Sequence, residues 1–216
     1  MVPIASEVFF KANKNNDNKI FGFTTLDLVR ASTFVAAEAD LESEEVSVPV
    51  IGGHSETTIV PVFSQTYPHA ELSQCQIKRL TKAVREAGTE IVKAKMGNGS
   101  ATLSTAFALS RFTISIVKGL QGHRNVVECS FVRSDVVPEC SFFSTPVELG
   151  AVGIKKNLGL PLLNEYENCL LSTAIPTIQK DIEKGIKFVY DTYLVREQEE
   201  RVKLLCKHKL KCTECI

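Results

Sequence analysis

The strongest constraint on the fold of this chain comes from two pairs of β-branched runs, each pair separated by a short connection. Residues 126–133 (VVECSFVR) and 140–150 (CSFFSTPVELG) form the first pair, and residues 46–53 (VSVPVIGG) and 57–64 (TTIVPVFS) form the second. Runs of this composition are typical of strands when turn residues bound them. The first pair therefore predicts an antiparallel meander, and the second predicts two strands around a loop.

Helical periodicity fills most of the sequence outside these runs. Apolar residues recur with the spacing of one helix face over 24–41, 71–96, 102–119 and 164–193, and a short helix is expected to open the chain. Pro176 interrupts the last stretch, and its missing N–H predicts a kink or a fresh helix start there. The sequence thus predicts long helices beside antiparallel strands.

Composition excludes several classes of protein. Hydrophobic residues make up 44% of the 216 residues, which is enough for a packed core, and 25 basic residues balance 25 acidic ones. Zero formal net charge and the absence of Trp predict neither a nucleic-acid partner nor binding to an acidic membrane surface. No apolar run reaches the roughly 18 residues of a membrane span. The opening segment lacks the features of a targeting signal, and the seven cysteines are expected to be free thiols.

The residues best suited to chemistry are an Asp–Arg pair and a His in a Gly-rich loop. Asp27 and Arg30 lie three residues apart and share a helix face, and His54 follows Gly52 and Gly53 between two predicted strands. A carboxylate on one imidazole nitrogen fixes the tautomer and favours the charged ring, and a guanidinium binds a carboxylate through two hydrogen bonds. These side chains would suit proton transfer on a carboxylate substrate. The commoner alternative is a helix ion pair and an exposed loop His.

Three other groups of residues have weaker functional interpretations. The turn 97–102 (GNGSAT) has Gly-rich spacing, but it follows a predicted helix rather than a strand, which argues against a dinucleotide site. Basic residues of the helix 71–96 are expected to form a solvated face. They are Lys78, Arg79, Lys82 and Arg85. Four potential zinc ligands near the C-terminus lack the spacing of a known zinc finger, so no metal is predicted. They are Cys206, His208, Cys212 and Cys215.

Four motifs in order resemble one known family. They are FGFTTLDLVRASTFVA, VSVPVIGGHSETTIVP, EAGTEIVKAKMGNGSATLS and VVECSFVRS. Together they are similar to the C-terminal half of mitochondrial-type malate dehydrogenases, in the lactate/malate dehydrogenase family, and the resemblance runs nearly from Val2 to Phe188. It implies an α+β fold in which antiparallel strands pack with long helices. The family's N-terminal Rossmann domain is absent from the resemblance.

The resemblance also implies roles for the Asp–Arg–His constellation. His54 would be the proton acceptor and donor, Asp27 would orient and charge it, and Arg30 would bind a substrate carboxylate. The implied reaction is the reversible oxidation of malate to oxaloacetate with NAD, a step of the tricarboxylic acid cycle.

Residues around the Gly-rich turn take further implied roles. Ser100, Ala101 and Thr102 would line the substrate pocket, and Thr105 stands where the family usually has a Met beside the nicotinamide. The family's phosphate-binding turn and the loop with two more substrate arginines precede the resembling part. We therefore expect the isolated chain to be inactive.

Several consequences of the resemblance concern assembly and context. It implies a homodimer and the mitochondrial matrix, with the cytoplasm as the alternative because no targeting segment is expected. The chain is interpreted as a truncated C-terminal catalytic domain over 1–192 and a charged, Cys-containing tail over 193–216. Two explanations of its length stay open, a fragment of a full enzyme or a short paralogue. In the second case the function would be that of a non-catalytic interaction subunit that pairs with intact dehydrogenase chains.

Overall fold

An antiparallel sheet organises the part of the chain that the computed structural model describes, which is residues 1–14 and 16–213, with side chains through residue 193. Within this part the sheet has six strands in the order β1-β4-β5-β2-β3, and β6 pairs with β5. Every strand pair within this sheet is antiparallel, as predicted. The strands are β1 (Gly22–Phe23), β2 (Val50–Gly52), β3 (Ile59–Pro61), β4 (Val126–Val137), β5 (Cys140–Gly150) and β6 (Gly153–Asn157).

The two predicted strand pairs join into this one sheet through β5. The β4, β5 and β6 strands follow each other as a meander, and β2 pairs with β3 around a loop. A single register pair, Gly52 with Ser144, connects β2 to β5. This junction places the Gly-rich loop after β2 beside the middle of the meander.

Helices cover the sheet in three hydrophobic clusters. The helices are α1 (Val2–Lys11), α2 (Thr25–Ala39), α3 (Gln74–Ala94), α4 (Thr102–Leu120) and α5 (Glu165–Thr213), and short 3-10 turns are η1 (Asp17–Lys19), η2 (Glu56–Thr58) and η3 (Phe63–Gln65). Buried residues of α2 and α3 pack with β2 and β3, those of α5 pack with β2, β3 and β5, and α4 lies against β4 and β5. The apolar periodicity of α2 and α3 explains which of their faces is buried.

Local signals fix where the helices begin. Ser73 and Gln76 form a reciprocal capping box at the start of α3. At the start of α5, Asn164 Oδ1 accepts from the backbone N–H of Glu167 at 2.9 Å, and the Glu167 carboxylate accepts from the backbone N–H of Asn164 at 2.9 Å. Glu167 is buried, and it also accepts from the N–H and the hydroxyl of Ser64, which ties α5 to η3.

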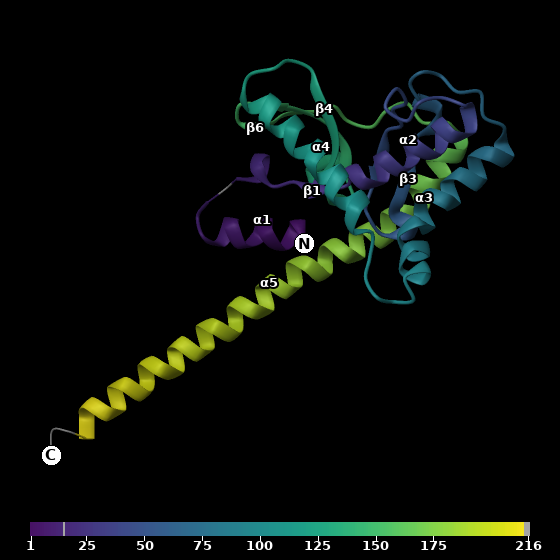
Figure 1. Cartoon of the computed structure of the whole chain (residues 1–216). Coiled ribbons are helices and arrows are strands. Elements are labelled where there is room, and N and C mark those ends of the chain that lie inside the picture. The colour runs from purple at the N-terminus through teal and green to yellow at the C-terminus, as the bar shows by residue number, and fades with distance from the viewer. Residues whose placement is uncertain (15, 214–216) are drawn as a thin grey trace.

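One of the two alternatives predicted at Pro176 is wrong. We expected a kink or a fresh helix start, and Pro176 lies inside α5, which does not restart there; the kink stays a prediction. The neighbouring Ala174 and Ile178 are buried in the cluster with β5, so packing on both sides of the proline compensates for the hydrogen bond that it cannot donate. In Figure 1 the C-terminal end of α5 extends away from the sheet, and α1 lies beside the middle of α5.

The α5 backbone continues past residue 192, so the proposed division into 1–192 and 193–216 stays a prediction. The four potential zinc ligands of the C-terminal segment lie outside the residues whose side chains are described. No helix in the described part of the chain is long and apolar enough to cross a membrane.

Candidate active site

The first turn of α2 supplies a buried carboxylate. Thr24 occupies the N-cap position, but its hydroxyl donates to the carbonyl of Cys129 at 3.1 Å and lies 2.9 Å from the Ser144 hydroxyl. The helix start is thereby fixed to the sheet through a side chain that would otherwise cap it. Three residues later Asp27 is fully buried, at the helix end whose dipole favours a negative charge.

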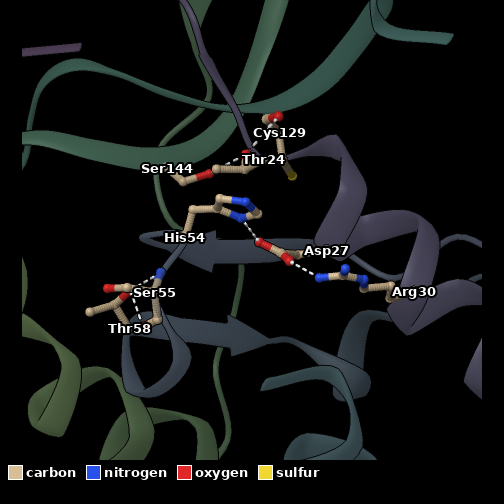
Figure 2. Close-up of polar contacts among 8 residues, drawn as sticks. All are labelled: Thr24, Asp27, Arg30, His54, Ser55, Thr58, Cys129 and Ser144. Carbon is tan, nitrogen blue, oxygen red and sulfur yellow. Dashed lines mark hydrogen bonds and ion pairs between the residues drawn. The ribbon is translucent and has the colours of Figure 1, made fainter. Parts of the chain in front are cut away.

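Asp27 contacts both His54 and Arg30. The Asp27 Oδ2 atom lies 2.5 Å from His54 Nδ1, and its Oδ1 atom lies 3.4 Å from Arg30 Nη1. Figure 2 shows the carboxylate between the imidazole ring and the guanidinium. The hydrogen bond that His54 Nδ1–H donates to Asp27 raises the pKa of His54, against the opposing effects of burial and of the Arg30 charge. The arrangement fixes one ring nitrogen and leaves the half-exposed His54 side chain able to exchange a proton on the other.

The loop that carries His54 is closed on itself by Thr58. Gly53 N–H donates to the Thr58 carbonyl at 2.9 Å, and the Thr58 hydroxyl accepts from Ser55 N–H and donates to the Ser55 carbonyl (Figure 2). A Cβ atom on Gly52 would lie 2.2 Å from the Thr58 carbonyl oxygen, and one on Gly53 would lie 2.5 Å from the Thr58 hydroxyl. Gly52 also has a φ of +98°, so the turn requires glycine there for both space and backbone conformation.

His54 borders two cavities. The larger, about 470 Å³, is also lined by Asp27, Arg30 and Glu56. The smaller, about 360 Å³, lies against the start of α1 and is lined largely by apolar residues, among them Phe23 and Ile178. The larger cavity therefore combines a proton-transfer group with a guanidinium, as a site for an anionic substrate requires.

The turn before α4 brings part of the predicted site to the larger cavity. Ser100, Ala101 and Thr105 line it, whereas Thr102 does not. The Thr105 hydroxyl donates to the Ala101 carbonyl, and the Ser100 carbonyl accepts from Lys95 Nζ at 2.7 Å. Thr102 is exposed at the first position of α4. Its side chain forms no hydrogen bond with a described residue of the cavity wall.

The α3 helix contributes wall residues that sequence reasoning missed. We expected Arg85 on a solvated face, but it is partly buried and lines the larger cavity with Gly88 and Thr89. The other basic residues of this helix fit the expectation better, since Lys82 and Arg79 have mostly exposed side chains. Helical periodicity alone places Arg85 one turn before Gly88 on α3, but it cannot show that Arg30 of α2 packs on Gly88.

No group of three or more His, Cys, Asp or Glu side chains suited to a metal ion occurs among the described residues. Cys129 is buried, and burial raises the pKa of its thiol to about 11, which makes it an inert core residue.

Comparison with known proteins agrees with this geometry. The family model for the lactate/malate dehydrogenase, alpha/beta C-terminal domain, matches residues 24–189. The mitochondrial malate dehydrogenase of Homo sapiens is 52% identical over 188 residues, which are 87% of this chain and 55% of that protein. The one of Bos taurus is 51% identical over the same shares. The chain thus spans about half the length of these curated relatives.

Solved structures show the same fold at low sequence identity. The apo malate dehydrogenase of Picrophilus torridus matches with a TM-score of 0.71 and 22% identity, covering 90% of this chain and 61% of that one. The malate dehydrogenase of Salinibacter ruber matches with a TM-score of 0.71 and 22% identity, covering 88% and 62%.

The matched domain and the sequence relatives show that this chain belongs to the lactate/malate dehydrogenase family. The matched part is the C-terminal domain of that family, and the relatives named above are mitochondrial malate dehydrogenases. The resemblance identified from the four sequence motifs and its α+β fold are confirmed.

Proposed function

We propose that this chain supplies the substrate-binding and proton-transfer half of an NAD-dependent malate dehydrogenase. The observation that carries the proposal is the contact of Asp27 with both His54 and Arg30 at the wall of one cavity. The malate dehydrogenase relatives support malate and oxaloacetate as the substrates.

The chemistry of these residues follows from their positions. Arg30 binds one carboxylate of malate and thereby brings the 2-hydroxyl group toward the imidazole. His54, with Asp27 on Nδ1, accepts the hydroxyl proton at Nε2 as malate is oxidised and returns it when oxaloacetate is reduced. Asp27 stabilises the imidazolium that forms, which favours proton abstraction.

The residues present fit the substrate better than the dinucleotide. NAD needs a cradle of backbone N–H groups for its phosphates, commonly a Gly-rich turn between a strand and a helix. The described sheet is antiparallel throughout, and the turn at 97–102 connects two helices. We therefore assign no cofactor step to these residues, and we infer that NAD is held by a Rossmann domain outside them. Thr105 remains our candidate for a contact with the nicotinamide.

A chimera tests whether this chain supplies the substrate-binding half and a separate domain supplies the NAD-binding half. The N-terminal part of the human mitochondrial malate dehydrogenase would be fused before Met1, and malate-dependent reduction of NAD would be measured. We expect turnover in the chimera and none in the isolated chain. His54→Asn should abolish turnover, and Asp27→Asn should lower it by a hundredfold or more at an unchanged fold. Full activity of the Asp27→Asn chimera would overturn the assigned roles.

The mass of the natural polypeptide decides how the activity is organised. Capture from its source with an antibody to the C-terminal segment, followed by intact-mass measurement, gives one of two results. A mass greater by a domain, on the order of 100 to 150 residues, would place the activity in a longer enzyme. A mass equal to this chain would favour an interaction subunit that pairs with intact dehydrogenase chains.

An exposed apolar face on α4 supports the dimer in either case. Leu103, Phe107, Ile114 and Val117 recur at helical spacing and are all more than 40% exposed. Exposed apolar residues on one face of a helix are typical of a chain–chain contact or of an aggregation-prone surface. We propose that it lies at the interface of a homodimer. Light scattering on the wild-type chain and on Phe107→Ser should show a dimer that the substitution dissociates; a wild-type monomer would contradict it.

We also propose the mitochondrial matrix as the location, because the sequence relatives named above are mitochondrial. Cell fractionation with the same antibody would check this, and recovery only in the cytosol would contradict it.

A further inference from the structure

The turn between α3 and α4 contains the only Asn–Gly step of the sequence, in which Gly99 follows Asn98. Both residues are exposed, and the turn lies at the larger cavity, because Ser100 and Ala101 line that cavity together with Arg30. Asn98 precedes Ser100 by two residues, so their Cα atoms lie at most about 7 Å apart. A new charge at Asn98 would therefore act on an anion in the cavity.

Hydrogen bonds hold the backbone on both sides of this step. The Asn98 N–H donates to the Lys95 carbonyl at 2.9 Å. The Ser100 carbonyl accepts from Lys95 Nζ at 2.7 Å and from the Thr102 N–H at 3.0 Å. By contrast, the Asn98 side-chain amide and the Gly99 N–H form no hydrogen bond with any described residue. The side-chain amide and the backbone nitrogen that follows it are thus both available for reaction.

Gly99 also leaves the approach to its own nitrogen open. Its φ is +116°, and a Cβ atom added there would meet nothing within 4 Å. Glycine places no side chain beside the nitrogen and restricts the backbone least of all residues. The exposed Asn125 is the opposite case, because the β-branched Val126 follows it at the start of β4. The two asparagines therefore differ in the access to the next backbone nitrogen.

We propose that Asn98 is a site of spontaneous deamidation, which places a carboxylate beside the larger cavity and weakens the binding of anions there. The Gly99 nitrogen attacks Cγ of Asn98, a C–N bond closes a five-membered succinimide, and the Cγ–Nδ2 bond breaks. Ammonia leaves with the proton of the Gly99 N–H. Water then opens the ring at Cγ to give aspartate, or at the backbone carbonyl carbon to give isoaspartate. The reaction needs water and no oxidant, reductant or cofactor.

The modification itself does not depend on the proposed function, but its effect on malate rests on that function and deepens it. Arg30 supplies a positive group for a carboxylate, and a negative charge on the neighbouring turn opposes the binding of the same anion. Because hydrolysis of the amide is not reversed spontaneously, the affinity for malate should fall with the age of each molecule.

Peptide mapping by mass spectrometry tests the site without a ligand. The purified full chain would be incubated at mildly alkaline pH and digested at mildly acidic pH, where the reaction is slow. We expect the peptide with Asn98 to gain about 1 Da at least about tenfold faster than the peptide with Asn125. Asn98→Gln should abolish the gain, because the longer side chain would have to close a six-membered ring. Equal rates at the two asparagines, or no gain at Asn98, would overturn the assignment.

Malate binding tests the effect on the cavity. Dissociation constants would be measured from the NMR shifts of the His54 ring in the wild type, Asn98→Asp and the matched control Asn125→Asp. The control adds the same charge beyond the other end of α4, a helix of 19 residues that is about 28 Å long. We expect Asn98→Asp to weaken malate binding about threefold at low salt and by less at high salt, and Asn125→Asp to leave it unchanged.

The two experiments separate the modification from its consequence. Equal malate affinity in Asn98→Asp and Asn125→Asp would overturn the effect on the cavity, even if the Asn98 peptide gains mass. A loss of affinity that does not decrease with salt would also contradict it, because a charge effect is screened. Failure of the wild type to bind malate would overturn the proposed function and the effect on malate together, while the mass gain would still decide the modification site.

Discussion

Two glycine-containing turns of this protein lie at the same cavity but are built in opposite ways. In the turn at Gly52 and Gly53, added Cβ atoms would collide with Thr58 at 2.2 and 2.5 Å. In the turn at Gly97 and Gly99, an added Cβ would meet nothing within 4 Å. In the first turn, Thr58 packs where the glycine side chains would be, and the turn carries His54, the proposed proton-transfer residue. The second is open, and its glycines serve only the backbone conformation.

Gly52→Ala should produce the largest effect. The positive φ costs about 1 kcal/mol for a residue with a Cβ, and the collision with the Thr58 carbonyl adds about 2 kcal/mol or more of overpacking. We expect the free energy of unfolding to fall by about 3 kcal/mol in chemical denaturation. A loss no larger than that of Gly97→Ala, which has positive φ without the collision, would show that packing does not distinguish the two turns.

Thr58→Val should produce the second largest loss in the free energy of unfolding. Valine keeps the shape of the buried side chain but removes the hydroxyl that serves both Ser55 backbone groups. The Ser55 carbonyl keeps its bond from the Thr58 N–H at 2.7 Å, but the Ser55 N–H loses its acceptor, which costs about 2 kcal/mol. Thr113→Val is the control, because the Thr113 hydroxyl donates to the Leu109 carbonyl on an exposed helix face. Equal losses in the two variants would mean that Thr58 has no special role in closing the loop.

The pH dependence of stability should be a smaller effect, in which the stabilisation by Asp27 decreases as the pH rises. Asp27 raises the pKa of His54 above its ordinary value of 6.5, so the folded protein favours the protonated ring. The stabilisation is therefore fully present below about pH 6.5 and is lost as the pH rises through the raised pKa. Urea unfolding of the wild type and Asp27→Asn should differ most at low pH. A difference between the two proteins that is constant with pH would contradict the assignment.

Gly97→Asn should have the smallest effect. Asn tolerates a φ near +78° better than other residues with a Cβ, and the site is open. We expect a change in the free energy of unfolding within about 0.5 kcal/mol. A large loss would indicate that the turn contacts a segment outside the described residues.

Much of the fold followed from local patterns. β-Branched runs and turn residues located the β4 and β5 strands of the meander, and helical spacing located α3 and α4 to within a few residues. A fresh helix start at Pro176 was the wrong alternative, because the local rule does not include the packing of α5 on the sheet, which keeps the helix continuous there. Element type depends on neighbours in sequence, and continuity across a proline depends on contacts that are distant in sequence.

Some features of the candidate site could likewise be predicted from the sequence, and others could not. Its residue types and the spacing of Asp27 and Arg30 were evident from the sequence, because residues three apart share a helix face. The part of the cavity wall that α3 contributes was not evident from the sequence, since the spacing of basic residues on α3 does not distinguish Arg85 from the exposed Lys82. Thr102 was expected at the pocket with Ser100 and Ala101, but the start of α4 turns it toward solvent.

By itself the sequence determined the α+β class, the family and the candidate groups for proton transfer, because these depend on composition and on short-range spacing. Only the tertiary structure decided which groups meet. The register pair of Gly52 with Ser144 sets the His54 loop beside α2, and the packing of α2 on α3 encloses Arg30 and Arg85 in one cavity. The physical reason is that burial and charge compensation arise from contacts between segments far apart in the chain, which no local pattern encodes.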